Sequence, residues 1–374
     1  MNTGSDRKQT VAIVYSHFPH YREAIFRELN NSEEFEFDFY FSRDAVDQTI
    51  AESSKIEIGR VLPALVIGPF LYQFGLHRKL LSGSYKAVIF LGNPYHISVW
   101  IYSLIARASS TRILFWTHGW LSRERGIRGI LRSLFYRLAD GLLLYGNRAR
   151  EIGLEFGFKS RRLHVIYNSL DYDKQKRVRD ELLQSQTAQP ICEPYLLYVG
   201  RLVREVQLEL LVDALLILKE QYDLSPRVLI VGAGPEQASL SSKCSRCSLN
   251  VHFCGPIYSE QELGALFINA VCVVSPGKVG LLAMHALAYG AIVVTHDNLD
   301  NQMPEFEALQ LGVTGEVFRE GDARSLAVIL ENVLARHEQR RFSNVAIAEI
   351  EAKYTPQKQR SVIEAALRQH INRF

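Results

Sequence analysis

Short apolar runs recur along the whole chain and alternate with segments whose apolar residues have helical spacing. Residues 10–15 have the pattern of a buried strand, and the apolar residues within 24–29 then fall on one face of a helix. Residues 35–41 alternate as a strand does. Alternating strands and helices favour an α/β fold with a parallel sheet and right-handed crossovers. Further apolar runs that predict strands lie at 87–91, 112–117, 142–145 and 163–167.

A second series of strands and helices begins at Tyr195, after a polar segment at 172–194 that is helical in character and then contains proline. A chain of 374 residues is also longer than one hydrophobic core usually supports, since single cores rarely exceed ~250–300 residues. We therefore predict two doubly wound domains that face a central cleft, because such sheets bind ligands at their carboxyl ends. The predicted strands of the second series lie near 195–199, 227–231, 250–254, 271–274 and 291–295.

The predicted divisions follow from these two series. The first domain is predicted at 1–175, a linker at 176–194 and the second domain at 195–351. The charged segment at 352–374 is predicted as a final helix that packs back toward the first domain.

The charge balance of the chain narrows the classes of partner. A formal net charge of +3 and a pI near 8.5 are too mild to indicate nucleic-acid binding.

Five scattered cysteines and a polar opening segment, residues 1–9, predict a reducing, cytoplasmic setting without a signal peptide. The longest nearly apolar run, residues 61–76, contains prolines and glycines and falls short of the ~20 residues that span a bilayer. We therefore expect a chain that does not cross a membrane.

A basic amphipathic helix is predicted within 121–138. Its apolar positions keep helical spacing, and Arg125, Arg128 and Arg132 occupy the other face. The sequence leaves two interpretations open: the helix packs on its own sheet, or it lies on an anionic membrane surface. The apolar positions are Ile127, Ile130, Leu131, Leu134, Phe135 and Leu138.

Residues 275–290 predict a strand end, a glycine-containing loop, a helix and a tight turn. The backbone N–H groups of residues 277–280 would lie at the N-terminus of this helix, which begins near Leu281. The first N–H groups of a helix have no partner within it and lie at the positive end of its dipole, so they attract anions. The loop therefore predicts a cradle for a diphosphate.

Three side chains that follow predicted strands are candidates for ligand contacts. Arg201 follows the strand at 195–199, where a guanidinium either binds phosphate oxygens or forms an ordinary salt bridge. His118 follows the strand at 112–117 and is either a hydrogen-bond donor to a ligand or a structural histidine. Glu305 lies in the loop after the strand predicted at 291–295, where its carboxylate either faces the cleft or is simply solvated.

Two other patterns carry weaker signals. Residues 231–235 contain Gly-x-Gly after a strand, but Gln237 stands where a dinucleotide site has its third glycine, so a tight turn is the better interpretation. A cluster of cysteines and one histidine has a spacing that fits no standard zinc module, and we expect core or surface residues there. The four residues are Cys244, Cys247, His252 and Cys254.

In their order along the chain these motifs resemble those of the retaining family 4 glycosyltransferases. That family has the GT-B fold, in which two Rossmann-like α/β domains face a central cleft. The resemblance covers nearly the whole chain and is stronger in the second domain. The chain also resembles a branch of the family that assembles bacterial polysaccharides. The matching segments are 118–119, 139–141, 168–171, 200–202, 231–235, 253–255 and 275–290.

The resemblance implies roles for individual residues and marks three departures. Arg201 matches an arginine that grips the donor diphosphate, and His118 matches a histidine that contacts the sugar near the reacting carbon. In place of the family's lysine and two glutamates, this chain has Val206, Gly277 and His285.

We therefore expect another cation, Arg204 or Lys278, to supply the missing charge, and His285 to donate to the ribose. The predicted catalytic residues are His118, Arg201 and Glu305, with Glu305 positioning sugar hydroxyls. No metal ligand is predicted. The predicted donor-binding residues are Gly200, Arg201, Gly234, Gly277, Lys278, Val279, Gly280, Leu281 and His285.

The implied activity is transfer of a sugar from a nucleotide-diphosphate sugar, with retention of configuration, to a glycan or a polyprenyl-diphosphate-linked acceptor. Protein cations would stabilise the leaving diphosphate without a metal or a further cofactor. We expect a role in surface polysaccharide biosynthesis on the inner face of the cytoplasmic membrane, with peripheral contact through 121–138. Two alternatives remain: a catalytically impaired scaffold that acts as a partner subunit, suggested by Val206 and Gly277, and a nucleotide-sugar epimerase of the same fold.

Overall fold

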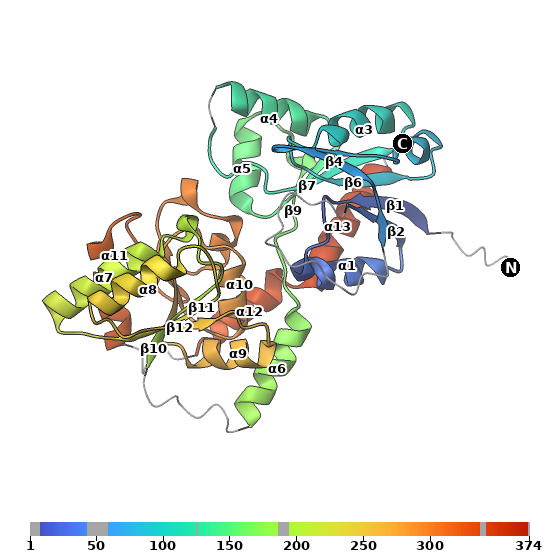
Figure 1. Ribbon diagram of the computed structural model, residues 1–374. Coiled ribbons are helices and arrows are strands. Elements are labelled where there is room, and N and C mark those ends of the chain that lie inside the picture. Colours follow the sequence, from blue (N-terminus) through green and yellow to red (C-terminus); the bar gives the residue numbers. More distant parts are fainter. Residues whose placement is uncertain (1–7, 43–58, 125, 186–193, 337–341, 373–374) are drawn as a thin grey trace. The chain divides into compact units, whose positions relative to one another are not determined.

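The computed structural model describes residues 8–42, 59–124, 126–185, 194–336 and 342–372 (Figure 1). The chain divides into two compact units. The first unit contains residues 1–171 together with 355–374, and the second unit contains residues 172–354. Each unit is built around its own parallel sheet.

The described residues of the first unit form a parallel sheet of seven strands in the order β3-β2-β1-β6-β7-β8-β9. The order runs outward from β1 in one direction and then restarts beside β1 with β6, so the switch point lies between these two strands. A separate antiparallel hairpin joins β4 (Ala64–Ile67) to β5 (Phe70–Gln73). The sheet strands are β1 (Gln9–Val14), β2 (Phe35–Phe41), β3 (Gly59–Val61), β6 (Ala87–Leu91), β7 (Arg112–Thr117), β8 (Gly141–Leu144) and β9 (Leu163–Val165).

Alternate residues of these strands pack into two cores, one on each face of the sheet. One core joins the sheet to α1 (Glu23–Asn30) and to α13 (Pro356–Ile371), the last helix of the chain. The other core joins it to α3 (Ile97–Ala108), α4 (Ile127–Arg137) and α5 (Asn147–Glu155), with the short α2 (His77–Leu81) at its edge.

The described residues of the second unit form a parallel sheet of six strands in the order β12-β11-β10-β13-β14-β15. Its switch point lies between β10 and β13. The strands are β10 (Tyr195–Val199), β11 (Arg227–Val231), β12 (Val251–Gly255), β13 (Cys272–Ser275), β14 (Val293–His296) and β15 (Gly315–Phe318). The helices are α6 (Tyr172–Gln184), α7 (Leu208–Tyr222), α8 (Gln237–Arg246), α9 (Glu260–Asn269), α10 (Leu281–Ala288), α11 (Ala323–Ala335) and α12 (Asn344–Lys353).

The predicted α/β class with two doubly wound parallel sheets is confirmed. Within the predicted linker, residues up to Gln184 continue helix α6, which packs against α9 in the second unit, and residues 186–193 lie outside the described residues. Helix α13, within the predicted final segment, packs against α1, β8 and β9 of the first unit. No described helix combines the length and the hydropathy needed to cross a bilayer.

Candidate functional site

The switch point of the second sheet brings two loops together at the carboxyl ends of neighbouring strands. The loop after β10 contains Gly200, Arg201 and the short 3-10 helix η3 (Arg204–Val206), and the loop after β13 contains residues 276–280. Open α/β sheets bind ligands in the crevice at this place, because the strands on either side lead their connections in opposite directions. The two loops are therefore where the fold favours a ligand.

Gly277 lets these two loops touch through their backbones. Its N–H group donates to the carbonyl oxygen of Val206 at 3.0 Å. A Cβ atom at position 277 would overlap the carbonyl oxygen of Glu205 and lie 3.0 Å from the carbonyl carbon of Val206. Only glycine permits this approach without a backbone shift. The position that lacks the family's glutamate is thus packed against the position that lacks its lysine.

The Gly-x-Gly turn after β11 serves the same packing. The N–H group of Leu202 donates to the carbonyl oxygen of Ala233 at 3.0 Å. A Cβ atom at Gly232 or Gly234 would overlap backbone atoms of the loop after β10. The interpretation of 231–235 as a tight turn agrees with this contact. Gly234 therefore supports the candidate site through backbone packing.

The loop after β13 leads into the N-terminus of α10, with Gly280 as the N-cap. Two of its N–H groups already have partners: that of Gly277 donates to Val206, and that of Val279 donates to the side chain of Gln302 at 2.8 Å. Within the described part of the chain, no hydrogen bond engages the N–H groups of Lys278, Gly280 or Leu281. The predicted cradle of four consecutive N–H groups is thus replaced by a smaller set at the helix start, because the loop is tied down on both sides.

Gln302 holds this loop in place through side-chain hydrogen bonds, a role that was not predicted from the sequence. Its side chain is 4% exposed, accepts from Val279, and donates to the Thr295 hydroxyl and the His296 carbonyl oxygen, both at 2.9 Å. One amide therefore links the glycine loop to the end of β14. The sequence held little signal for this role, because a glutamine after a polar loop is ordinarily solvated.

The cations of the site differ in their surroundings. Arg201 is exposed at the end of β10, and its carbonyl oxygen accepts a hydrogen bond from the Tyr198 hydroxyl at 2.9 Å. Lys278 is exposed on the loop after β13. Hydrogen bonds from Asn298 and Asn301 lower the pKa of Glu320, and the positive charges of His296 and Lys278 act in the same direction. Lys278 therefore lies near the end of β14 as well as beside the helix start.

Arg204 lies elsewhere in the loop. It lines a separate pocket of about 350 Å³ together with Glu209, Asp213 and Glu236. Val206, in the family's lysine position, is partly buried and packs against the apolar core of the second unit. Of the two cations expected to replace the missing lysine, Lys278 is therefore the better placed.

His285 lies in the middle of α10 and contacts a carboxylate of α9. Its Nε2 atom is 2.8 Å from Oε1 of Glu260, to which the Tyr289 hydroxyl also donates at 2.8 Å. Burial raises the pKa of Glu260, but the hydrogen bond and charge of His285 and the hydrogen bond from Tyr289 outweigh it, so the net pKa lies below its usual value. One ring nitrogen of His285 is therefore engaged within the protein, which leaves only Nδ1 for the predicted ribose contact.

Glu305 lies in the short 3-10 helix η5 (Pro304–Ala308), which packs against α10. Its side chain is 3% exposed, so it is not the solvated loop carboxylate that was one of its two interpretations. The buried setting and the contact with α10 keep it near the candidate site.

His118 lies in the first unit, after β7. It is exposed, and its ring meets that of Tyr145 edge-on at 4.7 Å between centroids. Behind it, Arg22 is 4% exposed and donates to Tyr145 at 2.5 Å and to Asn168 at 2.6 Å. Arg22 is thus a buried support at the carboxyl edge of this sheet.

The cysteine cluster holds no metal site among the residues that the structure describes. Cys244 is buried in the core of the second unit, whereas Cys254 is exposed on β12. These surroundings agree with the expectation of core and surface residues.

Comparison with known proteins adds to this geometry. Residues 181–347 match a family model described as glycosyl transferases group 1. No curated protein sequence matches the chain.

Solved structures resemble the whole chain at low sequence identity. HepE from Anabaena, in complex with UDP, has a TM-score of 0.71 and 16% identity over 96% of this chain and 99% of its own. The lipopolysaccharide outer core galactosyltransferase WaaB has a TM-score of 0.69 and 16% identity over 96% and 99%. A putative UDP-N-acetylglucosamine 2-epimerase from Listeria monocytogenes has a TM-score of 0.61 and 15% identity over 98% of both chains.

At these identities the structural likeness establishes the fold, and the family match covers the unit that carries the candidate site. The chain has the GT-B fold, and its residues 181–347 match the family model of glycosyl transferases group 1.

Proposed function

We propose that the chain transfers a sugar from a nucleotide-diphosphate sugar and that its second unit binds this donor. The observation that carries the proposal is the start of α10, where the N–H groups of Gly280 and Leu281 follow the exposed Lys278 on the same loop. A helix N-terminus and a lysine together attract the charge of a diphosphate. Arg201, on the loop that touches this one, adds a guanidinium suited to phosphate oxygens.

The proposed chemistry places the protein's cations on the leaving diphosphate. Negative charge grows on the diphosphate as the bond to the sugar breaks, and preorganised donors that stabilise such charge contribute roughly 10²–10³ in rate. The reaction then needs no metal, because Arg201, Lys278 and the helix start meet that charge. We propose retention of configuration by attack of the acceptor hydroxyl on the same face, since no candidate carboxylate nucleophile is placed by the sequence pattern.

The remaining predicted residues act on the sugar and the acceptor in this proposal. His118 orients the sugar near the reacting carbon, and Glu305 positions its hydroxyl groups. HepE is solved with UDP and WaaB is a lipopolysaccharide galactosyltransferase, which supports a nucleotide sugar as donor and a glycan as acceptor. We propose a glycan or polyprenyl-diphosphate-linked acceptor, in surface polysaccharide biosynthesis at the cytoplasmic face of a membrane.

Replacement of Arg201 tests the proposal. Arg201→Ala is expected to lower turnover with the nucleotide sugar by at least about 100-fold, because a charged contact to the leaving group is lost. Arg204→Ala removes a neighbouring cation that lines a different pocket and is the matched control, with turnover expected near that of the wild type. Near-normal turnover of Arg201→Ala would sink the assignment of the donor site.

A non-catalytic scaffold is the second candidate function, and two observations favour it. Val206 packs against the core where the family has a lysine, and His285 is already bonded to Glu260. A folded chain that neither hydrolyses nor transfers any nucleotide sugar would support this reading. An epimerase would instead release a sugar epimer without an acceptor, which the same product analysis detects.

A further inference from the structure

A pocket lined by arginines lies in the first unit, at the amino edge of its sheet. Arg112 is the first residue of β7, Asp140 precedes β8, and Arg162 precedes β9. His118 and Tyr145 follow the opposite, carboxyl ends of β7 and β8, so the length of the sheet separates the pocket from the edge of the proposed reaction. The pocket has a volume of about 210 Å³, and its lining residues are Arg107, Arg112, Arg137, Ala139, Asp140, Arg161, Arg162 and His370.

Hydrogen bonds to main-chain carbonyl oxygens hold two of these arginines in place. Arg107 donates to the carbonyl oxygens of Arg137 and Leu138, at 3.1 and 2.9 Å. Arg162 donates to those of Arg137, at 3.3 Å, and Ala139. These carbonyl groups lie at the carboxyl end of α4 or just beyond it, where the helix dipole favours cations. A carbonyl group has no net charge, so each guanidinium is fixed in position and keeps its full positive charge.

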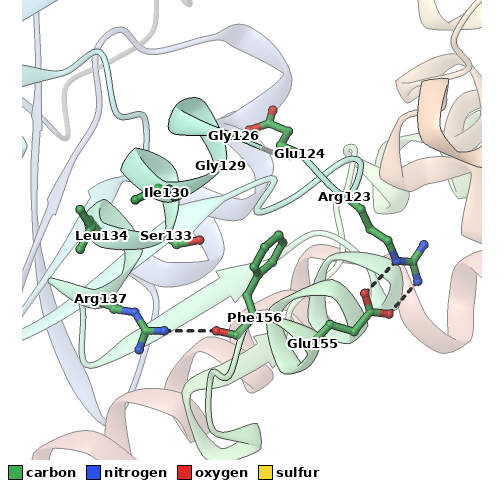
Figure 2. Close-up of a pocket in the computed structure, with 10 residues that line it drawn as sticks. All are labelled: Arg123, Glu124, Gly126, Gly129, Ile130, Ser133, Leu134, Arg137, Glu155 and Phe156. Atoms are coloured by element: carbon green, nitrogen blue, oxygen red, sulfur yellow. Dashed lines mark hydrogen bonds and ion pairs between the residues drawn. The ribbon is translucent and has the colours of Figure 1, made fainter.

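Arg137 belongs both to the pocket and to a neighbouring groove of about 580 Å³ between α4 and the end of α5 (Figure 2). Figure 2 shows its side chain reaching toward the carbonyl oxygen of Phe156, 3.2 Å away, which is again an uncharged acceptor. Elsewhere in the groove Arg123 is paired with the carboxylate of Glu155 at 2.7 Å. An anion in the pocket therefore contacts Arg137 without displacing a carboxylate of the groove.

The carboxylate of the pocket does not balance its five arginines. Among the lining residues Asp140 alone is acidic, and it accepts from the N–H group of Ile113 at 2.9 Å. Burial lowers the pKa of Arg162; Asp140 opposes this effect, and the charges of three neighbouring arginines lower the pKa further. Cations that repel one another in this way favour a ligand that carries several negative charges.

The pocket also contains a residue of α13, the helix that returns the chain to the first unit. His370 is 3% exposed, and its Nε2 atom lies 2.9 Å from Nε2 of His164 on β9. A Cβ atom at Gly141 would lie 2.6 Å from the same Nε2 atom, so the helix fits closely against the start of β8. Gln369 donates to the carbonyl oxygen of Arg161 at 2.6 Å. A ligand that fills the pocket therefore contacts both α13 and the segment before β9.

The exposed apolar face of α4 is a different surface. Of the six apolar positions predicted on this helix, Phe135 is buried in the core and Leu138 packs against it, but the other four are 51–77% exposed. Packing on the sheet is therefore wrong for most of the stripe. Within the described residues, α4 contributes Arg137 to the arginine pocket but none of these six side chains. The predicted Arg125 lies outside the described residues.

We propose that the arginine pocket binds a compact soluble polyanion, of which inorganic diphosphate is the simplest, and that the bound anion holds α13 on the first unit. The contacts of His370 and Gln369 link the pocket to α13, and an anion that binds only when this helix is docked stabilises the docked state. The proposal does not depend on the proposed sugar transfer.

Charge and size select this class of ligand. The planar forks of several guanidinium groups match the oxygens of a chain of phosphates. The pocket is smaller than the roughly 300–1,000 Å³ of sites for drug-sized ligands, so it favours a compact anion. Ala139 is the apolar residue of the lining and is fully buried, so an acyl chain gains no apolar contact in the pocket.

Hydrogen exchange of the full chain, with and without inorganic diphosphate, tests the effect on α13. At about 100 times the Kd, the amides of α13 and β9 are expected to exchange about 100-fold more slowly, because release of the helix then requires release of the ligand. The same protection is expected in Arg201→Ala, which removes a cation of the proposed donor site.

Calorimetry with diphosphate, in the Arg201→Ala background, tests the pocket itself. Adding Arg161→Glu is expected to weaken binding roughly 10- to 150-fold, because a charge-assisted contact is lost. This variant keeps the main-chain carbonyl oxygen that accepts from Gln369, so α13 stays docked without the ligand. Arg161→Lys keeps the charge and is expected to retain most of the affinity. Arg246→Glu, the same charge reversal at an exposed site of the second unit, is the matched control and is expected to leave binding unchanged.

Three results overturn the proposal. The first is unchanged exchange of α13 and β9 with diphosphate, and the second is equal affinity of the proteins that carry Arg161→Glu and Arg246→Glu. The third is binding of phosphatidylglycerol vesicles that depends on Arg161, without any binding of diphosphate, because the source of the phosphate is then a lipid. Far-ultraviolet circular dichroism confirms that each variant is folded.

Discussion

Gly277 and Val206 stand where the resemblance expects a glutamate and a lysine, and the two positions are in contact through their backbones. The N–H group of Gly277 donates to the carbonyl oxygen of Val206, and no Cβ atom fits between the loops. A side chain at 277 requires the loop that carries Val206 to move. With neither a glutamate at 277 nor a lysine at 206, the proposed donor site draws its charge from Arg201 and Lys278.

Substitution at position 277 tests this packing. Gly277→Ala is expected to lower the free energy of unfolding by roughly 1–3 kcal/mol, the usual cost of forcing an extra group into a tightly packed site. Urea unfolding, followed by a spectroscopic signal from the second unit, measures this free energy. Lys278→Ala, one residue along on the exposed loop, is the matched control and is expected to unfold like the wild type. An unchanged midpoint for Gly277→Ala would show that the loops part without cost.

The buried imidazole of His96 predicts a pH dependence of stability. His96 is 5% exposed at the start of α3, and burial, with the nearby charge of His17, lowers its pKa from 6.5 to about 4. The unfolded chain then binds more protons than the folded one between these pKa values, so stability is full above pH 6.5 and falls as the pH is lowered toward 4. The loss attributable to His96 is about 3 kcal/mol at pH 4 and below.

Urea unfolding at several pH values measures this loss. The variant His96→Asn cannot titrate in this range, and its stability is expected to fall less than that of the wild type between pH 6.5 and 4. Parallel loss of stability in the two proteins would rule out His96 as the source.

Local sequence patterns point to side chains at strand ends, but they do not point to side chains that act through partners. Arg201 was predicted because a strand end followed by arginine is a local pattern, and its contact with a ligand stays a prediction. Gln302 and Glu260 escaped, because their roles depend on Val279, Thr295 and His285, which reach them only through the packing of different strands and helices. The spacing of residues along the sequence does not reveal which of them lie within hydrogen-bond distance in the folded chain.

At the scale of elements, the loop between β13 and α10 depends on the segment after β14 for its shape. Gln302 joins the two: it accepts from the Val279 N–H group of the loop and donates to the Thr295 hydroxyl and the His296 carbonyl oxygen of β14. A loop held in this way presents its remaining N–H groups in a fixed direction, so the proposed donor site would not have to be ordered when a nucleotide binds.

Removal of the Gln302 amide is expected to weaken both the fold and the donor site. Gln302→Leu leaves the Val279 N–H group and the His296 carbonyl oxygen buried without their partner, at a cost of roughly 1–3 kcal/mol for each unsatisfied group. We expect a lower melting temperature and a KM for the nucleotide sugar raised more than kcat is lowered. Gln310→Leu changes an exposed glutamine of the same unit and serves as control. A variant with the wild-type melting temperature and KM would refute the bracing role.

Helix α4 shows where hydrophobic periodicity stops being informative. The stripe from Ile127 to Leu138 has the spacing of a helix that packs on a sheet, and equally that of a helix that meets a lipid surface. In the structure only Phe135 and Leu138 of the stripe reach the core, which the spacing alone does not reveal. The sequence therefore predicted the helix correctly and left its exposed face undecided.

At the scale of the whole molecule, helix α13 completes one hydrophobic core of the first unit. Helix α13 packs against α1, β8 and β9, and Ile363, Ala366 and Leu367 belong to the core on that face of the sheet. The two alternating series of strands and helices were enough to predict two doubly wound sheets. The strand order was fixed only by the structure, since apolar runs do not identify their neighbours.

Deletion of residues 355–374 is expected to destabilise the first unit selectively. Loss of the buried α13 side chains exposes the core around α1. We expect the free energy of opening this unit to fall by roughly 3 kcal/mol, so that amide hydrogens of β1, β8 and β9 exchange faster by a factor of about 100 or more. Amides of β10 and β13 are expected to keep their protection, since they belong to the other unit. Hydrogen exchange read by mass spectrometry measures both, and equal loss in the two sheets would contradict the division into units.

The most direct test of the central claim, a nucleotide-diphosphate site in the second unit, is a thermal-shift panel with UDP, GDP, ADP, TDP and CMP in metal-free buffer. We predict that one nucleotide raises the melting temperature of the wild type by several degrees at about 100 times its Kd, where binding adds about 2.7 kcal/mol, and that Arg201→Ala abolishes the rise. No shift with any nucleotide, in protein shown to be folded, would contradict the claim and favour the non-catalytic scaffold.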